Sequence, residues 1–344
     1  MGDFIMNNTT QYIGLQSIQL ANPVYIQDYY SIAGKKEGQG PLGKYFGHIE
    51  SDDMFGCTTW EAAESALQSE TVQCLLHKSK LEPSHIRYIF AGDLLGQLMA
   101  TSFGLIDYNI PLFGLYGACS TMGEALSLGA MTISAGYADK VLSLASSHYA
   151  SAEKTFRFPL GYGSQTKSSA TRTVTGCGAV ILSTEQSFAK ISGITTGKLV
   201  DYGQKAKDNM GACMAPAAAD TIYHNLTDFG RTPEHYDKII TGDLGYVGQT
   251  ALFDLLHSKG YDISKVHMDC GIEIFDRDSQ HTNSGGSGCG CSASTLCSYI
   301  LKQIKENKWK RILFVPTGAL VSPVSSNEGN SIPGIAHGVV IEGV

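Results

Sequence analysis

The sequence predicts an α/β fold in which two halves, residues 1–185 and 186–344, follow one plan and carry mixed sheets layered with helices. Three observations support this prediction: an internal repeat, an alternation of strand-like and helix-like segments, and a composition typical of a compact chain. With 344 residues, of which 43% are hydrophobic and 17% charged, the chain is long and apolar enough to bury a sizeable core.

The internal repeat consists of four pairs of segments that occur in the same order in both halves. "YIFAGDLLGQ" (88–97) is paired with "KIITGDLGYVGQ" (238–249), and "GACSTMGEAL" (117–126) with "GCGCSASTLC" (288–297). "DKVLSLASSH" (139–148) is paired with "KRILFVPTGA" (310–319), and "TGCGAVILS" (175–183) with "AHGVVIEG" (336–343). One such match carries little weight, but four in a fixed order indicate a duplicated unit.

Within each half, helices and strands are predicted from the spacing of apolar residues. Apolar residues recur at i, i+3 and i+4 over residues 60–80 and 292–307, which predicts two helices. Continuous apolar runs such as "VLSLA" (141–145) and "RILFV" (311–315) are typical of strands buried on both faces. Alternation of such strands with helices favours parallel or mixed sheets covered by helices.

Charge and cysteine content restrict the classes of function. The chain has 25 Lys and Arg against 32 Asp and Glu, a net charge of −7, which argues against a nucleic-acid partner and against unaided docking on an anionic membrane. No segment approaches the roughly 20 apolar residues of a spanning helix, and the first residues lack the pattern of a signal peptide. The odd number of cysteines, nine, indicates reduced thiols. Without a C-x-x-C pair or a His-Glu-x-x-His motif, neither a metal site nor a cofactor is predicted.

Cys119 lies where an apolar run meets a predicted helix, in the sequence Gly117-Ala118-Cys119-Ser120. On one interpretation it is a nucleophile, because the N-terminal end of a helix favours a thiolate. The unpaired N–H groups at that end can also hold an oxyanion or a carboxylate ligand. On the other interpretation it is a small hydrophobic residue at a place that excludes bulk. The residues alone leave both interpretations open.

The duplicated plan, with a cysteine opening the central helix of the first half, resembles the thiolase-like fold of thiolases and ketoacyl synthases. That resemblance implies layers in the order αβαβα. Longer strings resemble the stage V sporulation protein AD family of spore-forming bacteria, from about residue 20 to the C-terminal end. They are "EGQGPLGKYF", "SSHYASAEKTFRFP", "MAPAAADTI", "FGRTPEHYD", "GGSGCGCSA" and "SIPGIAHGVV".

The resemblance to the sporulation family implies a protein that binds dipicolinic acid (pyridine-2,6-dicarboxylate), free or as its calcium chelate, for uptake into the developing spore. It implies membrane channel proteins as partners and a peripheral location at the spore inner membrane, and the fold implies a homodimer. Two alternatives stay open: an active acyltransferase of the thiolase or ketoacyl-synthase type that uses Cys119, and a structural scaffold for the channel complex.

The resemblance also indicates which residues form the site. Thiolase-like enzymes place a His or Asn after the Gly-Asp-Leu strand of the second half and another in its glycine-rich loop. This sequence has Asp243 at the first place and Cys289 or Cys291 at the second. An ionised carboxylate beside the thiol opposes thiolate formation and cannot donate a hydrogen bond to a thioester oxygen. We therefore expect a non-catalytic cleft between the halves where Cys119, Asp243, Cys289 and His337 converge.

Two further residues are candidates for ligand contacts. His148 ends a strand, where α/β proteins gather binding residues, and a turn or interface role is the alternative. Arg157 is the cation expected to hold a ligand carboxylate, because a guanidinium pairs bidentately with planar carboxylates. If residues 156–158 are extended, Phe156 and Phe158 point opposite to Arg157, and one of them can stack on a pyridine ring. An interface loop is the alternative for this segment.

Overall fold

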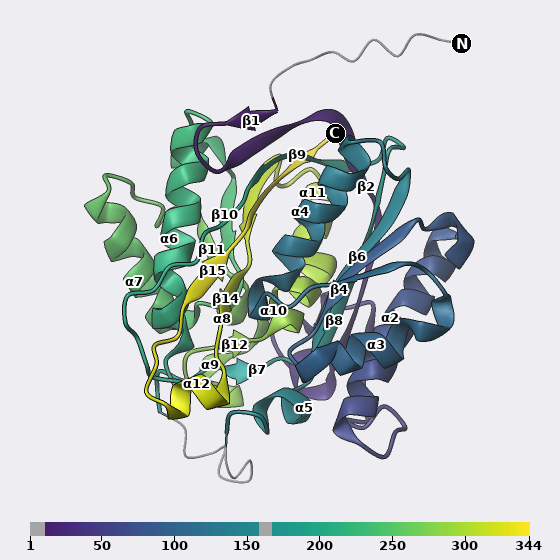
Figure 1. Cartoon of the computed structure of the whole chain (residues 1–344), viewed down its shortest axis with the longest axis horizontal. Coiled ribbons are helices and arrows are strands. Elements are labelled where there is room, and N and C mark those ends of the chain that lie inside the picture. Colours follow the sequence, from purple (N-terminus) through teal and green to yellow (C-terminus); the bar gives the residue numbers. More distant parts are fainter. Residues whose placement is uncertain (1–10, 158–166) are drawn as a thin grey trace.

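The computed structural model describes residues 11–157 and 167–344 (Figure 1). The strands are β1 (Tyr12–Ile13), β2 (Ser17–Gly34), β3 (His48–Glu50), β4 (Tyr88–Gly92), β5 (Leu112–Gly114), β6 (Lys140–Ser147), β7 (Arg172–Thr173), β8 (Gly176–Ser183), β9 (Ala189–Thr195), β10 (Lys238–Thr241), β11 (His267–Asp269), β12 (Gly286–Ser287), β13 (Arg311–Val315), β14 (Thr317–Ala319), β15 (Gly334–Ala336) and β16 (Gly338–Gly343). The α-helices are α1 (Lys35–Gly38), α2 (Trp60–Ser79), α3 (Met99–Leu105), α4 (Thr121–Ser134), α5 (Tyr149–Glu153), α6 (Met210–Asp228), α7 (Gly245–Ser258), α8 (Cys270–Ile274), α9 (Arg277–Gln280), α10 (Cys289–Thr295), α11 (Leu301–Lys305) and α12 (Pro323–Asn327).

The main sheet shows the duplication directly. Its strand order is β11-β10-β13-β16-β9-β2-β8-β6-β4-β5, with β1 and β3 attached to β2. The centre of the sheet is the antiparallel pair of β9 and β2. On one side, β16 is antiparallel to both β9 and β13. On the other side, β8 is antiparallel to both β2 and β6. Parallel strands follow, β10 and β11 on one side and β4 and β5 on the other. The paired segments of the sequence repeat therefore occupy equivalent places. The predicted boundary between residues 185 and 186 falls between β8 and β9, and as a domain boundary it stays a prediction.

The helices form layers around the two sides of this sheet. Figure 1 shows α4 and α10 between the half of the sheet around β4, β6 and β8 and the half around β10, β13 and β16. Helices α2 and α3 lie outside the first half, and α6 and α7 lie outside the second. This arrangement confirms the predicted mixed α/β fold with helices layered on sheets. Smaller pairs, β7 with β12 and β14 with β15, lie outside the main sheet.

Both helices predicted from apolar spacing are confirmed. The one over residues 60–80 is α2, which begins after Thr59, whose hydroxyl accepts a hydrogen bond of 3.2 Å from the Ala62 N–H. It ends at Ser79, and the next residue, Lys80, has the left-handed conformation typical of a helix terminus. The one over residues 292–307 corresponds to α10 and α11, which a π-helical turn over Leu296–Ile300 joins.

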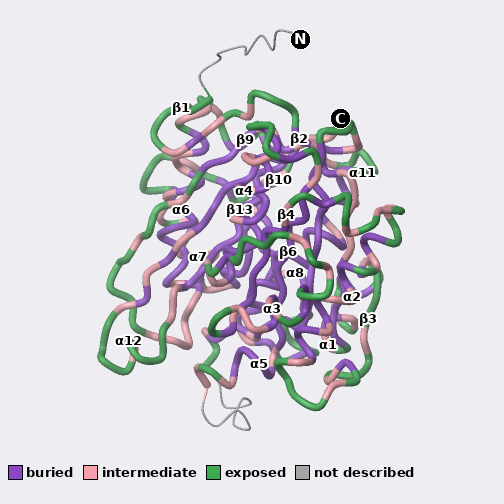
Figure 2. Tube along the Cα trace, turned by 45° about the vertical axis from the view of Figure 1, so that its right-hand side comes forward, coloured by how far each residue is buried: buried purple, intermediate pink, exposed green. Residues whose placement is uncertain are grey.

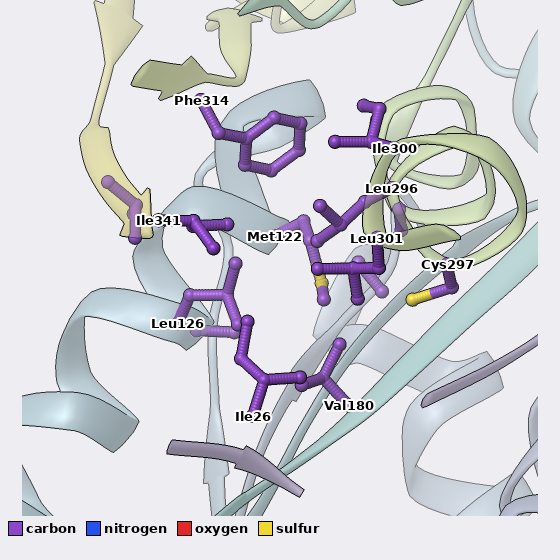
Figure 3. Packing of buried hydrophobic residues seen from close by; sticks show 14 of the residues in the cluster. Ile26, Met122, Leu126, Val180, Leu296, Cys297, Ile300, Leu301, Phe314 and Ile341 are labelled. Carbon is purple, nitrogen blue, oxygen red and sulfur yellow. The ribbon is translucent and has the colours of Figure 1, made fainter. Parts of the chain in front are cut away.

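The largest hydrophobic cluster surrounds the two central helices. Buried side chains of α4 and of the turns after α10 interdigitate there with side chains of both sides of the sheet (Figure 3). Those labelled are Ile26, Met122, Leu126, Val180, Leu296, Cys297, Ile300, Leu301, Phe314 and Ile341. Each large buried aliphatic side chain stabilises the fold by about 1.5–3 kcal/mol relative to an exposed one. Burial is concentrated in this interior, whereas the outer loops are exposed (Figure 2). The rigid centre fixes the ends of α4 and α10, on which the candidate site is built.

Candidate functional site

Cys119 lies at the start of the central helix α4, in a tight turn that begins at Gly117. Its neighbour Ala118 has a φ of +51°, in the left-handed region that residues with a Cβ rarely occupy. Such conformations persist only where surrounding contacts enforce them, and they concentrate at functional sites. One of these contacts comes from the start of α10, where the Cys289 thiol donates a hydrogen bond of 3.0 Å to the Ala118 carbonyl oxygen. The two central helices therefore meet at Cys119.

Asp243 provides a buried carboxyl group beside Cys119. It follows β10 and is 1% exposed. Its Oδ2 accepts a hydrogen bond of 3.0 Å from the Gly288 N–H, and its Oδ1 accepts one of 2.9 Å from the Thr317 hydroxyl. The Cys119 thiol donates a third. Burial raises the pKa of Asp243 to about 7, although these hydrogen bonds favour the ionised form. Both forms of the carboxyl group are therefore populated at neutral pH.

The Cys119 thiol is kept protonated by this environment. Burial raises the pKa of Cys119 well above its ordinary value, and the negative charge of ionised Asp243 raises it further. The Gly288 N–H acts in the opposite direction but does not outweigh them. The thiolate rather than the thiol is the nucleophile in cysteine catalysis, and this environment disfavours the thiolate of Cys119. The sequence predicts that a carboxylate at Asp243 opposes thiolate formation, and in the structure Asp243 does raise the pKa of Cys119.

A cleft of about 490 Å³ opens above Cys119, within the size range of small-molecule sites. Segments from both halves of the chain line it. The lining residues are Leu94, Gly96, Tyr116, Ala118, Cys119, Ala152, Thr155, Phe156, Thr173, Met210, Ser287, Gly288, Ala319, Leu320, Val321, Ser322 and Pro323. These described lining residues include hydroxyl groups and a thiol but no charged side chain, so the cleft is mainly apolar.

The structure brings together three of the four residues predicted to converge in this cleft. Cys119 lines it, and Asp243 and Cys289 contact Cys119 or its turn from the buried side. His337 is the exception. Its Nδ1 accepts a hydrogen bond of 3.3 Å from the Gly197 N–H, and it is not among the described residues that line the cleft. Burial lowers the pKa of His337 to about 4, so its imidazole is neutral.

His148 lies outside the cleft, at the start of α5. Its Nε2 donates a hydrogen bond of 2.8 Å to the Asp53 carbonyl oxygen, and its Nδ1 accepts one of 3.2 Å from the Ala150 N–H. Burial lowers the pKa of His148, which agrees with a neutral ring in this tautomer. His148 therefore caps α5 and lines a separate pocket with Trp60. The structure does not bring His148 to Cys119.

The condition of an extended segment around Arg157 is not met at Phe156 and Arg157. The Phe156 and Arg157 N–H groups both donate to the Glu153 carbonyl oxygen, at 3.2 and 2.8 Å, so the chain continues as a turn after α5. Arg157 Nε bonds Glu153 Oε2 at 2.5 Å, a carboxylate that is itself buried. Phe156 lines the cleft, Arg157 does not, and Phe158 lies outside the described residues. Glu153 lies four residues before Arg157, the spacing of a local ion pair, and pairs with its guanidinium group.

Thr317 is a site residue that sequence reasoning missed. Its hydroxyl fixes one oxygen of Asp243, yet 74 residues separate the two in the chain. No local signal identifies such a pair; only the duplicated plan, which places β13 beside β10, brings Thr317 near.

The cysteines and acidic residues give no sign of a disulfide or a metal centre. All nine cysteines are unpaired. Within residues 11–157 and 167–344, no group of three or more His, Cys, Asp or Glu is arranged to hold a metal ion. The two carboxylate oxygens of Asp269, for example, accept hydrogen bonds from Thr241, Leu244 and neighbouring N–H groups. In the same ranges, no helix has the length and apolar character needed to cross a membrane.

Comparison with known proteins places the chain in a family. A sequence model described as stage V sporulation protein AD matches residues 14–342. The chain belongs to the stage V sporulation protein AD family. The stage V sporulation protein AD of Bacillus subtilis (strain 168) is 40% identical over 329 residues, which cover 96% of this chain and 97% of that protein. The chain is thus a sporulation protein of this family.

Solved structures similar to this member of the stage V sporulation protein AD family share its fold. The 3-oxoacyl-[acyl-carrier-protein] synthase III of Aquifex aeolicus VF5 has a TM-score of 0.58 at 14% identity, covering 93% of this chain and 99% of its own. The Acat5 thiolase of Ascaris suum in complex with coenzyme A has a TM-score of 0.58 at 12% identity, covering 94% and 100%. At this identity the likeness concerns the fold alone, which is thiolase-like.

Proposed function

We propose that this protein binds dipicolinic acid without catalysing a reaction, in the Cys119 cleft, for uptake of the ligand into the developing spore. The observation that carries the proposal is the protonated Cys119 thiol, beside the buried Asp243 carboxyl group, in a cleft lined by no described charged residue. Within the proposal, the bound form is the calcium chelate rather than the free dianion.

The Cys119–Asp243 pair supports binding over catalysis. A condensing enzyme needs a thiolate and hydrogen-bond donors aimed at the thioester oxygen. Here the titratable partner of the thiol is a carboxyl group that raises the thiol pKa. None of the described residues that line the cleft carries an imidazole or a side-chain amide.

The charge of the cleft supports the calcium chelate as the ligand. Transfer of an unpaired carboxylate from water to an apolar site is strongly unfavourable. Dipicolinate is a dianion at neutral pH, whereas its one-to-one calcium chelate has no net charge. Tyr116 and Phe156 both line the cleft, and each offers an aromatic surface on which the flat pyridine ring can stack. A neutral, planar chelate therefore matches the lining better than the free dianion does.

Titration calorimetry tests this assignment. We expect the calcium chelate to bind, and we expect Tyr116→Ala to weaken its binding about tenfold by removing an aromatic wall of the cleft. Tyr137→Ala, which removes an exposed tyrosine outside the cleft, is the matched control and should bind as the wild type does. The proposal fails if pyridine-2-carboxylate binds as tightly as the dicarboxylate chelate, or if both tyrosine variants bind equally well.

The acyltransferase alternative has its own test. A condensing enzyme forms a covalent acyl adduct, so incubation with acyl-coenzyme A followed by intact-mass spectrometry reports it. We expect no adduct. An acyl group on Cys119 would overturn the non-catalytic part of the proposal, and cleft variants that load spores with dipicolinate as the wild type does would favour the scaffold alternative.

Assembly and location complete the proposal. We propose a homodimer that forms through β5, the edge strand of the main sheet, where Leu112 and Phe113 are 42% and 52% exposed. Antiparallel pairing of two β5 strands around a twofold axis would cover these side chains and the free strand edge. Membrane channel proteins of the same sporulation system as partners, and a peripheral location at the spore inner membrane, belong to the same proposal, and fractionation of sporulating cells checks the location.

A further inference from the structure

A second pocket, of about 310 Å³, lies on the other side of α5 from the Cys119 cleft. The N-terminal residues of α5, Tyr149 and Ala150, line this second pocket, whereas Ala152 lines the cleft. Strand β7 also separates the second pocket from the cleft. Arg172 lines the second pocket and its neighbour Thr173 lines the cleft, because successive side chains of a strand point to opposite faces. The two sites share one wall but no lining residue.

The second pocket is basic. Lys35, Lys36 and Arg172 line it, and none of the described residues forms an ion pair with any of them. The other cations of the neighbouring segment differ, since Lys154 and Lys167 are each paired with a carboxylate. Lys36 Nζ donates one hydrogen bond, of 2.8 Å, to the Gln280 carbonyl oxygen, which leaves two of its protons for another acceptor.

Two acidic residues also line this pocket, and they offset only part of the charge of the three cations. Glu37 is buried, and its Oε1 accepts a hydrogen bond of 3.0 Å from the Thr175 N–H. Burial raises the pKa of Glu37 to about 7, so a large fraction of it is uncharged near neutral pH. Asp53 is exposed, and its backbone carbonyl rather than its side chain contacts His148. The pocket therefore has a net positive charge near neutral pH.

Arg172 presents a preorganised guanidinium group to this pocket. Its guanidinium carbon lies 3.8 Å from the centroid of the Tyr149 ring, which holds the planar group in place. Its Nε is buried and has no hydrogen-bond partner among the described residues. Buried polar groups are almost always satisfied, so this guanidinium N–H calls for an acceptor that the described residues do not supply.

The rim of the pocket adds a flat apolar surface. The Trp60 ring lies 5.6 Å from the His148 ring with an angle of 34° between their planes, and Trp60 is 38% exposed. Both His148 nitrogens already have backbone partners, so the histidine supports Trp60 instead of competing for a ligand. A planar molecule can lie along this surface with its acidic groups toward the three cations.

We propose that this pocket is a second ligand site, distinct from the Cys119 cleft, that takes a small planar dianion carrying two carboxylate groups. A guanidinium group pairs with a planar carboxylate through two parallel hydrogen bonds, and the two lysines supply charge for the second carboxylate. The two sites then differ in the charge they accept: the apolar cleft suits a neutral chelate and the basic pocket suits a free dianion.

Benzene-1,3-dicarboxylate is a suitable probe, because it has the carboxylate spacing of a meta-substituted ring but no ring nitrogen to hold calcium. In calorimetry with EDTA present, we expect the wild type to bind it more tightly than benzoate. Arg172→Gln should weaken binding at least about tenfold, and Arg172→Lys should recover part of the loss, because the charge returns without the planar fork. Lys265→Gln, an exposed cation outside the pocket, is the matched control.

A second variant protects the test against misfolding. Lys35 is exposed and makes no described hydrogen bond, so Lys35→Glu should leave thermal unfolding unchanged and still weaken binding of the probe. No binding of the probe by the wild type, or equal binding by wild type, Arg172→Gln and Lys35→Glu, overturns the second site. Because the probe does not chelate calcium and the Tyr116→Ala variant reports on the cleft, failure here and failure of the dipicolinate proposal are distinguishable.

Discussion

The Cys119 thiol and the Asp243 carboxyl group share a buried site, and the charge on one controls the protonation of the other. Replacement of Asp243 by Asn keeps acceptors and donors for Gly288 and Thr317 but removes the negative charge. We therefore expect Asp243→Asn to lower the pKa of Cys119 and to speed its alkylation by iodoacetamide about tenfold at pH 8. Peptide mapping by mass spectrometry measures the rate at Cys119.

The effect of Asp243 on the alkylation rate of Cys119 should depend on pH. The pKa of Asp243 is about 7, so its charge opposes thiolate formation above pH 7 and disappears below it. The difference in alkylation rate between wild type and Asp243→Asn should therefore grow as the pH rises from 6 to 8. Cys57 and Cys74, which are half-buried, serve as internal controls and should react alike in both proteins. Equal rates at Cys119 in both proteins at pH 8 would contradict the coupling.

At the residue scale, some site residues could be predicted from the sequence, but the partners of their side chains could not. The resemblance to thiolase-like enzymes implied that Cys119 and Asp243 are neighbours. Sequence reasoning selected Arg157 as the free cation, although the buried Glu153 pairs with it, and it passed over Arg172. The state of an arginine depends on which carboxylates lie within a few ångströms of it after folding. Sequence spacing can indicate a pair four residues apart, such as Glu153 and Arg157, but not which distant carboxylates come close to an arginine.

At the element scale, the contact of α10 with β8 depends on glycine. A Cβ at Gly178 of β8 would overlap the Ala293 carbonyl oxygen in α10, a backbone atom that cannot turn away. We expect Gly178→Ala to lower the free energy of unfolding by about 3 kcal/mol, as overpacking of a rigid core does. Denaturant titration followed by circular dichroism measures the change.

Gly338 in the equivalent strand β16 is the matched control. A Cβ there lies 3.3 Å from its nearest neighbour, the Thr221 methyl carbon, which is a side-chain atom. Gly338→Ala should change the free energy of unfolding by less than about 1 kcal/mol. A loss at Gly338 as large as that at Gly178 would show that the effect comes from strand propensity and not from the contact between helix and strand.

The elements that the sequence predicted well are those with strong periodicity. Helix α2 and the central strands β6 and β13 follow from apolar spacing, because burial on one helical face or on both sheet faces constrains many residues at once. The short elements α1, α5 and β7, which line the second pocket, have too few residues to carry such a pattern. Tertiary contacts determine them.

At the scale of the whole molecule, the free edge at β5 predicts the assembly. Phe113 is half exposed and stacks on Phe90 with centroids 5.1 Å apart, so its outer face is available to a second copy. We expect the wild type to sediment as a dimer and Phe113→Asp to sediment as a monomer, because the charge would be buried in the interface. Sedimentation velocity at several protein concentrations distinguishes the two.

Tyr202→Asp provides the control for this prediction, since Tyr202 is 67% exposed and distant in sequence from β5. It should leave the dimer intact. A monomeric wild type, or a dimer that survives Phe113→Asp, would rule out β5 as the interface. Either result leaves the two ligand sites to be judged by their own binding experiments.

The sequence by itself determined the duplicated α/β plan, the thiolase-like fold and the family. Repeats and apolar periodicity extend over many residues, and burial of a core requires them to agree with one another. Only the tertiary structure decided how the polar groups are paired. Asp243 meets Gly288 and Thr317 across 45 and 74 residues of chain, and Glu37 meets Thr175 across 138. Such contacts depend on single distances between distant segments, which is why both the neutral cleft and the basic pocket became visible only in the folded chain.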